Sequence, residues 1–164
     1  MHISINGVRI FFEIYGAKLT TRKNKIIEKP TMIFLHGGPG LGDHTAYTDF
    51  WRKFSRYSQV IFIDQRGNGR SEDGDIKDLN LSQWGKDVFT FCETLNIQKP
   101  IVAGVAFGGM VAMSYAIQFP EHPSKIILSN TQAKTDPIKR YNSYLRIGGK
   151  NAANAIRIFD SRRN

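Results

Sequence analysis

Short apolar runs alternate with stretches of helical periodicity along the first 130 residues of the chain. Apolar runs typical of strands covered on both faces occur at 31–35, 59–63, 100–105 and 125–129. Between them, apolar side chains recur every three or four positions in stretches that begin near Tyr47, Ser82 and Met110. Ser82 is in a position to cap the second of these helices. The alternation predicts parallel strands joined by right-handed helical crossovers.

The two ends of this pattern differ from its middle. Residues 2–5 and 8–15 predict an antiparallel hairpin, because Asn6-Gly7 between them tolerates the positive φ of a tight turn. Residues 16–30 are polar and basic and predict a loop. Beyond Thr131 we expect a helix that opens at Pro137 and ends at Gly148-Gly149, followed by a second helix over 151–160.

Composition narrows the class of protein. The 164 residues are 41% hydrophobic and 23% charged, without a run of 18 apolar residues or a secretory leader. The single cysteine, Cys92, lies on an apolar helical stripe and predicts a core residue rather than a nucleophile. These features favour a cytoplasmic protein without a membrane partner.

The net charge of +9 is concentrated in the tail. Residues 131–164 carry eight Lys or Arg against two Asp, which is +6 of the total. A basic tail on a nearly balanced body favours a solvated helical face over a nucleic-acid site, so we expect no nucleic-acid partner.

Candidate chemistry centres on the turn between a strand and a helix at 104–109. The sequence Gly104-Val105-Ala106-Phe107-Gly108 has the glycines of the G-x-S-x-G nucleophile elbow, but Ala106 stands at the serine position. Two further polar loops follow predicted parallel strands: His36-Gly37-Gly38-Pro39-Gly40, and residues 64–71. Open α/β sheets place their sites at these carboxyl ends. Glycines in such a loop also allow a backbone N–H to face an oxyanion.

In order and spacing, these three stretches resemble the α/β-hydrolase family, and more narrowly its proline iminopeptidase-like branch. The resemblance implies an α/β-hydrolase core, with a mostly parallel sheet flanked by helices and an N-terminal antiparallel hairpin. It places Ala106 at the nucleophile position and the N–H groups of Gly38 and Phe107 in the oxyanion hole. The remaining residues of the first loop would line the site: His36, Gly37, Pro39 and Gly40.

The chain departs from the family pattern in two ways. Ala106 replaces the nucleophilic serine, and no late strand carries the acid and the histidine of a triad. None of His2, His36, His44 and His122 lies where that order requires the base. We therefore expect residues 1–131 to be the N-terminal part of the core and 132–164 the start of a helical cap, within a longer chain.

These expectations define a function and its alternatives. The resemblance implies a serine-type hydrolase of an ester or amide carbonyl, N-terminal peptides included, that is inactive as written because of Ala106. No cofactor is implied; the partners would be a small-molecule or peptide substrate and the C-terminal part of the same protein. Because the surrounding motifs are kept, we interpret Ala106 as a substitution of the serine.

Two alternatives remain open. The first is a natural non-catalytic binding or signalling protein with this fold. The second is a nucleotide-binding domain, which Asp43 and His44 disfavour because a P-loop needs Lys and Ser or Thr there. The spacing of potential ligands predicts no metal site.

Overall fold

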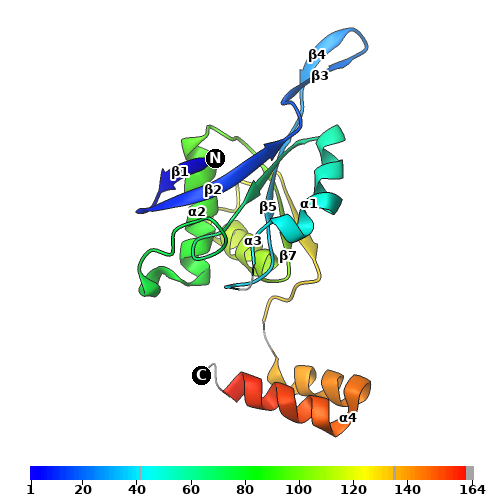
Figure 1. The fold of residues 1–164 in the computed structure, drawn as a ribbon. Helices are drawn as coiled ribbons and strands as arrows, with labels where there is room; N and C mark the ends of the chain where they lie inside the picture. The colour runs from blue at the N-terminus through cyan, green and yellow to red at the C-terminus, as the bar shows by residue number, and fades with distance from the viewer. Residues whose placement is uncertain (41, 135, 162–164) are drawn as a thin grey trace. The chain divides into compact units, whose positions relative to one another are not determined.

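The computed structural model describes residues 1–40, 42–134 and 136–161. The chain divides into two compact units, Met1–Gln132 and Ala133–Asn164. The first unit contains a six-stranded sheet in the order β1-β2-β6-β5-β7-β8 (Figure 1). Its strands are β1 (His2–Ile5), β2 (Val8–Tyr15), β5 (Thr31–Leu35), β6 (Gln59–Ile63), β7 (Ile101–Val105) and β8 (Lys125–Ser129).

The pairing of these strands confirms the predicted α/β architecture. β1 and β2 form an antiparallel hairpin through Asn6 and Gly7, whose φ angles are 46° and 78°. β2 pairs antiparallel with β6, whereas β6, β5, β7 and β8 run parallel to one another. The carboxyl ends of the parallel strands therefore meet at one edge of the sheet, where the polar loops begin.

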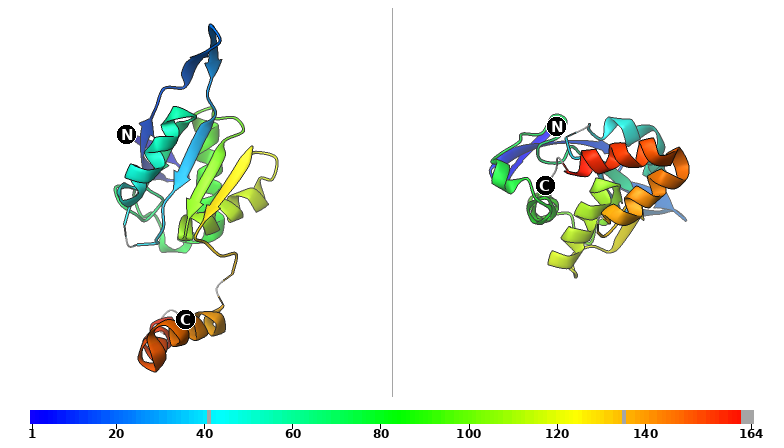
Figure 2. Two further views of the ribbon diagram at one scale, coloured as in Figure 1. Left: turned by 90° about the vertical axis from the view of Figure 1, so that its right-hand side faces the viewer. Right: turned by 90° about the horizontal axis from the view of Figure 1, so that it is seen from below.

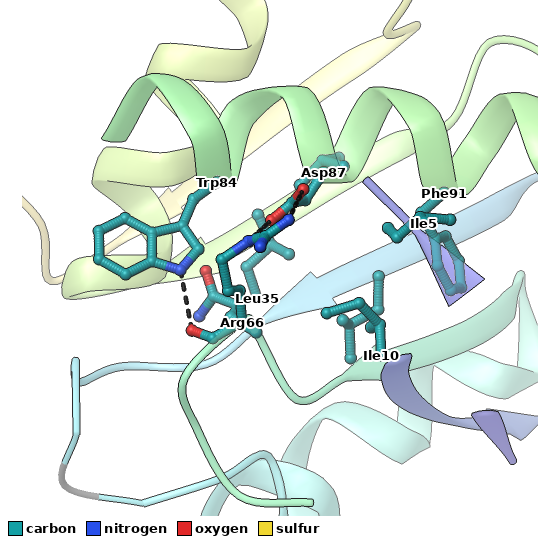
Figure 3. Close-up of a pocket in the computed structure, with 10 residues that line it drawn as sticks. Ile5, Ile10, Leu35, Arg66, Trp84, Asp87 and Phe91 are labelled. Atoms are coloured by element: carbon teal, nitrogen blue, oxygen red, sulfur yellow. Dashed lines mark hydrogen bonds and ion pairs between the residues drawn. The ribbon is translucent and has the colours of Figure 1, made fainter. Parts of the chain in front are cut away.

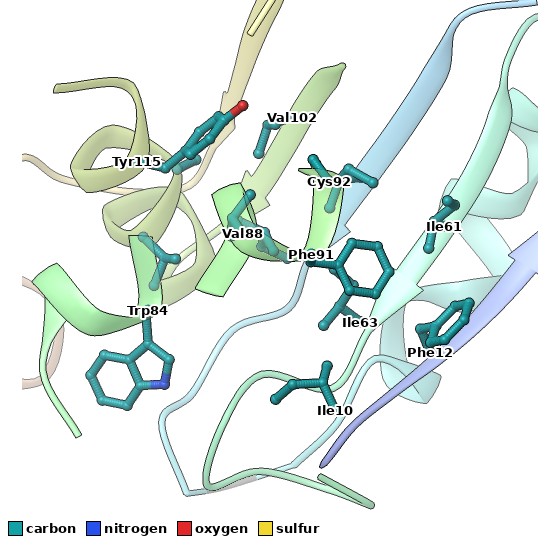
Figure 4. Packing of buried hydrophobic residues seen from close by; sticks show 14 of the residues in the cluster. Ile10, Phe12, Ile61, Ile63, Trp84, Val88, Phe91, Cys92, Val102 and Tyr115 are labelled. Atoms are coloured by element: carbon teal, nitrogen blue, oxygen red, sulfur yellow. The ribbon is translucent and has the colours of Figure 1, made fainter. Parts of the chain in front are cut away.

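Helices cover both faces of the sheet, which explains why its central strands are continuously apolar. In β5, Ile33 and Leu35 face the layer of α2 (Leu81–Thr94) and α3 (Phe107–Gln118). Met32 and Phe34 face the opposite layer, formed by α1 (Thr45–Trp51) and the 3₁₀ helix η1 (Arg52–Arg56). Figure 2 shows these two layers from further directions, and Figure 4 shows the packing of the larger cluster.

Local details of the helices correct one prediction and support another. Ser82 does not cap α2; the N-cap is Asn80, after the 3₁₀ turn η2 (Ile76–Asp78), and its side chain accepts from the Gln83 N–H at 2.9 Å. Cys92 is fully buried in the core, as predicted, and burial raises the pKa of its thiol to about 12. Cys92 is therefore a packing residue rather than a nucleophile.

The predicted loop at 16–30 is wrong. This segment contains a second two-stranded sheet, β3 (Leu19–Arg22) with β4 (Lys25–Glu28), turned at Lys23 and Asn24, both at positive φ. All eight strand residues are exposed, so no buried face marks the segment in the sequence. The pair is closed by backbone hydrogen bonding and by an exposed ion pair between Lys18 and Glu28 at 3.0 Å.

The second unit contains α4 (Pro137–Ser161), which is interrupted at Gly149, where φ is 69° and ψ is −169°. This break lies where the sequence predicts one, and it converts the segment into two helices. Ala153 and Ile156 are the buried apolar residues of the second helix among those described. Of the described helices, none is both long and apolar enough to cross a bilayer.

A buried ion pair joins the loop after β6 to helix α2. Arg66 is 1% exposed, and its Nε and Nη2 donate to the two carboxylate oxygens of Asp87 at 2.7 and 2.9 Å. Arg66 Nη2 also donates to the Asn6 carbonyl at 3.0 Å, and the Arg66 carbonyl accepts from Trp84 Nε1 at 3.0 Å. Figure 3 shows Arg66, Asp87 and Trp84 among the residues that line a small pocket, which has a volume of about 10 Å³. Arg66 thus links the N-terminal hairpin, the loop after β6 and α2.

Replacing Asp87 by Ala should lower the free energy of unfolding by about 3–5 kcal/mol, because it leaves a buried guanidinium without its counter-ion. Urea denaturation followed by circular dichroism measures this change. Asp49→Ala is the matched control: Asp49 is 95% exposed in its pair with Arg52, so its loss should cost at most about 1 kcal/mol. Equal effects of the two substitutions would contradict a structural role for the buried pair.

Candidate active site

The turn between β7 and α3 has the geometry of a nucleophile elbow. Ala106 occupies it at φ 50° and ψ −114°, a conformation that costs a non-glycine residue roughly 1–3 kcal/mol. Ala106 is exposed, whereas the residues on the helical side of it are buried. The Ala106 N–H donates to the Ser129 carbonyl at 3.1 Å, and its own carbonyl accepts from Thr131 Oγ1 at 2.6 Å. The strained residue is therefore held from both sides.

Two glycines make this turn sterically possible. A Cβ on Gly108 would lie 2.1 Å from the Leu35 carbonyl oxygen, and one on Gly104 would lie 2.3 Å from the Gly108 carbonyl oxygen. Both contacts are with backbone, which cannot move aside as a flexible side chain can. The first turn of α3 consequently rests directly on β5 and β7, and the side chain at position 106 projects outward.

The loop His36–Gly40, which we call the oxyanion loop, lies next to the elbow. A Cβ on Gly37 would be 3.5 Å from the Ala106 methyl carbon and 2.6 Å from the Tyr47 hydroxyl. Gly38 is partly exposed, with φ 153° and a cis peptide bond to Pro39, while Pro39 and Gly40 are exposed. Phe107 is the first residue of α3, so its N–H has no partner within the helix. The structure thus brings the oxyanion loop and the elbow together.

His36 holds the base of this loop. It is fully buried; its Nδ1 lies 2.6 Å from the Gly37 carbonyl, and its Nε2 accepts from the Gln65 N–H at 3.2 Å. Because Nε2 accepts, the proton of the neutral ring is on Nδ1. Burial lowers the pKa of His36, which keeps the ring neutral. His36 therefore supports the loop and is not available to exchange protons with a substrate.

A second buried group, which the sequence did not indicate, lies behind the loop. His44 is fully buried, and its Nδ1 is 2.5 Å from Asp64 Oδ1. Burial opposes ionisation of Asp64, but hydrogen bonds from His44 and Arg70 hold the pKa of that carboxyl well below its usual range. Only the position of His44 at the start of a helix was visible in the sequence, and that gave no signal of an ion pair.

The other two histidines, His122 and His2, have hydrogen-bond partners other than Ala106. His122 Nδ1 is hydrogen-bonded to the Tyr115 hydroxyl, and His2 Nε2 lies 3.4 Å from the Arg70 carbonyl. None of these hydrogen bonds links a histidine to Ala106. The described residues also contain no group of three or more His, Cys, Asp or Glu that could hold a metal ion.

The elbow glycines provide a direct stability test. Gly108→Ala should lower the free energy of unfolding by about 1–3 kcal/mol or more, since its Cβ would overlap the backbone of β5. Gly42→Ala serves as the control, because a Cβ there would meet nothing within 4 Å, and its effect should stay within about 0.5 kcal/mol. Thermal and urea unfolding report both values; a Gly108→Ala variant as stable as Gly42→Ala would disprove the close approach.

The chain is similar in sequence to known proteins over about three quarters of its length. A proline iminopeptidase named PfmaB from Pestalotiopsis fici is 32% identical over 127 residues, which is 74% of this chain and 43% of that protein. A proline iminopeptidase from Thermoplasma volcanium is 25% identical over 129 residues, covering 78% of this chain and 41% of the relative. The chain thus spans less than half the length of these curated relatives.

Solved structures show the same fold. A structure of epoxide hydrolases from hot-environment metagenomes superposes with a TM-score of 0.71 at 23% identity, covering 89% of this chain and 49% of that one. The model of the alpha/beta hydrolase fold family matches residues 30–158, which include both the oxyanion loop and the elbow. These matches confirm the resemblance to the proline iminopeptidase-like branch, and the chain belongs to the α/β-hydrolase family.

Proposed function

We propose that this chain carries the nucleophile-bearing part of a serine-type hydrolase that acts on an ester or amide carbonyl, with position 106 as the nucleophile position. The observation that carries the proposal is the strained, exposed residue at the elbow beside the oxyanion loop. As written, Ala106 has no atom that could attack a carbonyl, so the chain binds substrate without turning it over.

The chemistry follows from what surrounds position 106. A serine there would attack the carbonyl carbon, and negative charge would develop on the carbonyl oxygen. We assign the N–H groups of Gly38 and Phe107 as donors to this oxyanion, aided by the positive N-terminal end of α3. A single donor of this kind is worth about 10²- to 10³-fold in rate. The base and its acid partner would come from residues other than the described histidines, whose hydrogen bonds lead to groups other than Ala106.

The substrate proposed here is a peptide with a free N-terminus, or a small ester. Support for the peptide comes from the Gly37-Gly38-Pro39-Gly40 sequence and from the proline iminopeptidases among the relatives. A 3-oxoadipate enol-lactonase from Acinetobacter baylyi, 31% identical over 111 residues, supports the ester. We also propose that the protein is located in the cytoplasm and that it has no nucleic-acid partner.

A non-catalytic binding protein is the second candidate, and Ala106 itself favours it. Against it stands the cost of the scaffold: an alanine at positive φ is strained, and the glycines at 104 and 108 serve only to allow that strain. A binding protein gains nothing from such a turn. We therefore interpret Ala106 as a substitution of the serine, with the surrounding machinery kept.

The reaction class can be tested by supplying the missing base. Ala106→Ser in the 164-residue chain should be acylated by p-nitrophenyl acetate when imidazole is added, with an acetyl group located at position 106 by mass spectrometry. The rate should exceed that of an ordinary exposed serine by about 10²-fold or more, because the oxyanion donors are already in place. Without imidazole, acylation should be slow.

Two controls make this result specific. The parent chain with Ala106 measures background acylation, and Ala46→Ser places a serine at an exposed position of α1. If the Ala106→Ser variant is acylated no faster than the Ala46→Ser variant, while both keep the parent circular dichroism spectrum, the hydrolase proposal fails and the binding protein is favoured.

Accessibility of position 106 is tested separately with a thiol. Ala106→Cys should react readily with iodoacetamide, and the pKa of the new thiol should lie below the usual value of about 8.5, because a helix N-terminus stabilises a thiolate. Cys92 is the internal control, since burial raises its pKa to about 12. Mass spectrometry across a pH series measures both sites. Labelling of Cys92 but not of position 106 would contradict the exposed elbow.

A further inference from the structure

His44 lies between two carboxylates, each from a different part of the sheet. Its Nδ1 is 2.5 Å from Asp64 Oδ1, at the carboxyl end of β6, and its Nε2 is 3.3 Å from Glu13 Oε2 on β2. The side chains of His44 and Asp64 are fully buried, whereas that of Glu13 is 32% exposed. An imidazole with an acceptor at each nitrogen can satisfy both only when both nitrogens carry protons.

The charges around the ring favour the same protonation state. Glu13 and Asp64 bring two negative charges, and Arg70 brings one positive charge, 3.4 Å from Glu13 and 3.2 Å from Asp64. Asp43 adds a negative charge close by, although its carboxylate accepts a hydrogen bond from the Thr45 N–H. A protonated His44 is therefore needed to balance the buried group, which also has Tyr15 donating to Glu13 at 3.0 Å and the neutral His36 nearby.

Arg70 provides the one competing arrangement. Its Nη2 lies 3.4 Å from His44 Nε2, so a neutral His44 could accept a hydrogen bond from it. Arg70 already packs over the Phe11 ring at 3.7 Å and bonds to both carboxylates. The ring of His44 also packs against Phe11 and Phe62. The two protonation states thus differ in whether Nε2 donates to Glu13 or accepts from Arg70.

The position of His44 in the chain links this group to the proposed oxyanion loop. His44 follows the loop by four residues, and its backbone N–H also donates to Asp64 Oδ1, at 3.1 Å. On the loop itself, the Gly40 N–H donates to Asn68 Oδ1 at 2.6 Å, and Asn68 belongs to the same polar loop as Asp64 and Arg70. The two ends of the segment from Gly40 to His44 are therefore both attached to the loop after β6.

We propose that His44 is a positioning residue: its imidazolium, held between Asp64 and Glu13, fixes the oxyanion loop against β2 and the loop after β6. Loss of the Nε2 proton would remove the bond to Glu13 and leave Arg70 as the one positive charge beside the two carboxylates. The segment from Gly40 to His44 would then be held by fewer bonds, and the oxyanion donors would lose their fixed place. The role of the loop rests on the proposed function; the protonation of His44 does not.

The direction of the pH dependence follows from these contacts. Burial alone would lower the pKa of His44, but its hydrogen bonds and charge interactions with Asp64 and Glu13 raise it above the usual value. Because this pKa is raised, the contacts of the His44 imidazolium with Asp64 and Glu13 are complete below the ordinary histidine pKa of about 6.5. They are lost as pH rises through the higher pKa of the folded state. At low pH, the same contacts are lost when the carboxylates of Asp64 and Glu13 are protonated.

The experiment is a pH titration of the ¹⁵N-labelled 164-residue chain by NMR, without substrate. We expect both His44 nitrogens to give protonated shifts at a pH of about 6.5, the ordinary histidine pKa, and the Gly40 amide to lose protection from hydrogen exchange as His44 deprotonates. Glu13→Gln should lower the His44 pKa by about 1, the effect of removing one nearby opposite charge. His122→Gln is the control, because His122 pairs with Tyr115 instead.

Two results would overturn the proposal. One is a His44 Nε2 that stays unprotonated across the range of about pH 5 to 8 in which histidines titrate, which would mean that it accepts from Arg70. The other is a titration of His44 during which the protection factor of the Gly40 amide, its exchange rate relative to an unstructured peptide at the same pH, stays unchanged. The unmodified chain gives both readings, so they do not depend on whether a variant folds. Because no acylation is measured, either failure would leave the test of the hydrolase proposal intact.

Discussion

The contact on which the site depends is the direct approach of the first turn of α3 to the backbones of β5 and β7. No side chain separates these elements, since a Cβ at Gly104 or Gly108 would overlap a carbonyl oxygen. Layers packed on a sheet are normally held apart by side chains, at about 10 Å where two sheets face each other. Removing that spacer forces the intervening residue, Ala106, into a positive φ and turns its side chain outward. The exposed position and the strain are thus two results of one steric condition.

The loop after β6 provides the rigid surface against which this turn is set. Asp64 and Arg66 lie two residues apart, yet they point into different buried ion pairs, one with His44 and one with Asp87. The first pair reaches α1 and β2, and the second reaches α2 and the N-terminal hairpin. One short loop therefore binds both helical layers to the sheet. Such pairs cost desolvation, so their value lies in specifying a single arrangement.

The sequence predicts the parts of this fold that depend on local chemistry. Asn6-Gly7 specifies its own turn, Gly149 ends its own helix, and the apolar runs of β5 and β7 require two covered faces. Position 106 and its glycines are likewise visible as a motif. The prediction that Ser82 caps α2 was wrong because Asn80, two residues earlier, is the residue whose side chain accepts from the Gln83 N–H. The hairpin β3–β4 was missed because it has no buried face and so leaves no periodic pattern.

What could not be predicted arises from contacts between distant residues. His44 lies 31 residues from Glu13 and 20 from Asp64; the register of β2 against β6 brings the two carboxylates close, and the start of α1 places His44 between them. A histidine at the start of a helix gives no sign of such partners. The roles of Gly38 and Phe107 as oxyanion donors remain a prediction, because they concern an atom of a substrate rather than of the protein.

One hydroxyl links the elbow to the residues that follow β8. Thr131 follows β8 and is the next-to-last residue of the first compact unit, and its Oγ1 donates to the Ala106 carbonyl. Its side chain also fills the space that a Cβ on Gly109 would need, at 2.6 Å. The last residues of the first compact unit are therefore joined by a hydrogen bond to the peptide group of position 106, as well as through the chain to β8. A change at Thr131 would thus alter the contacts of the strained turn without touching the side chain at position 106.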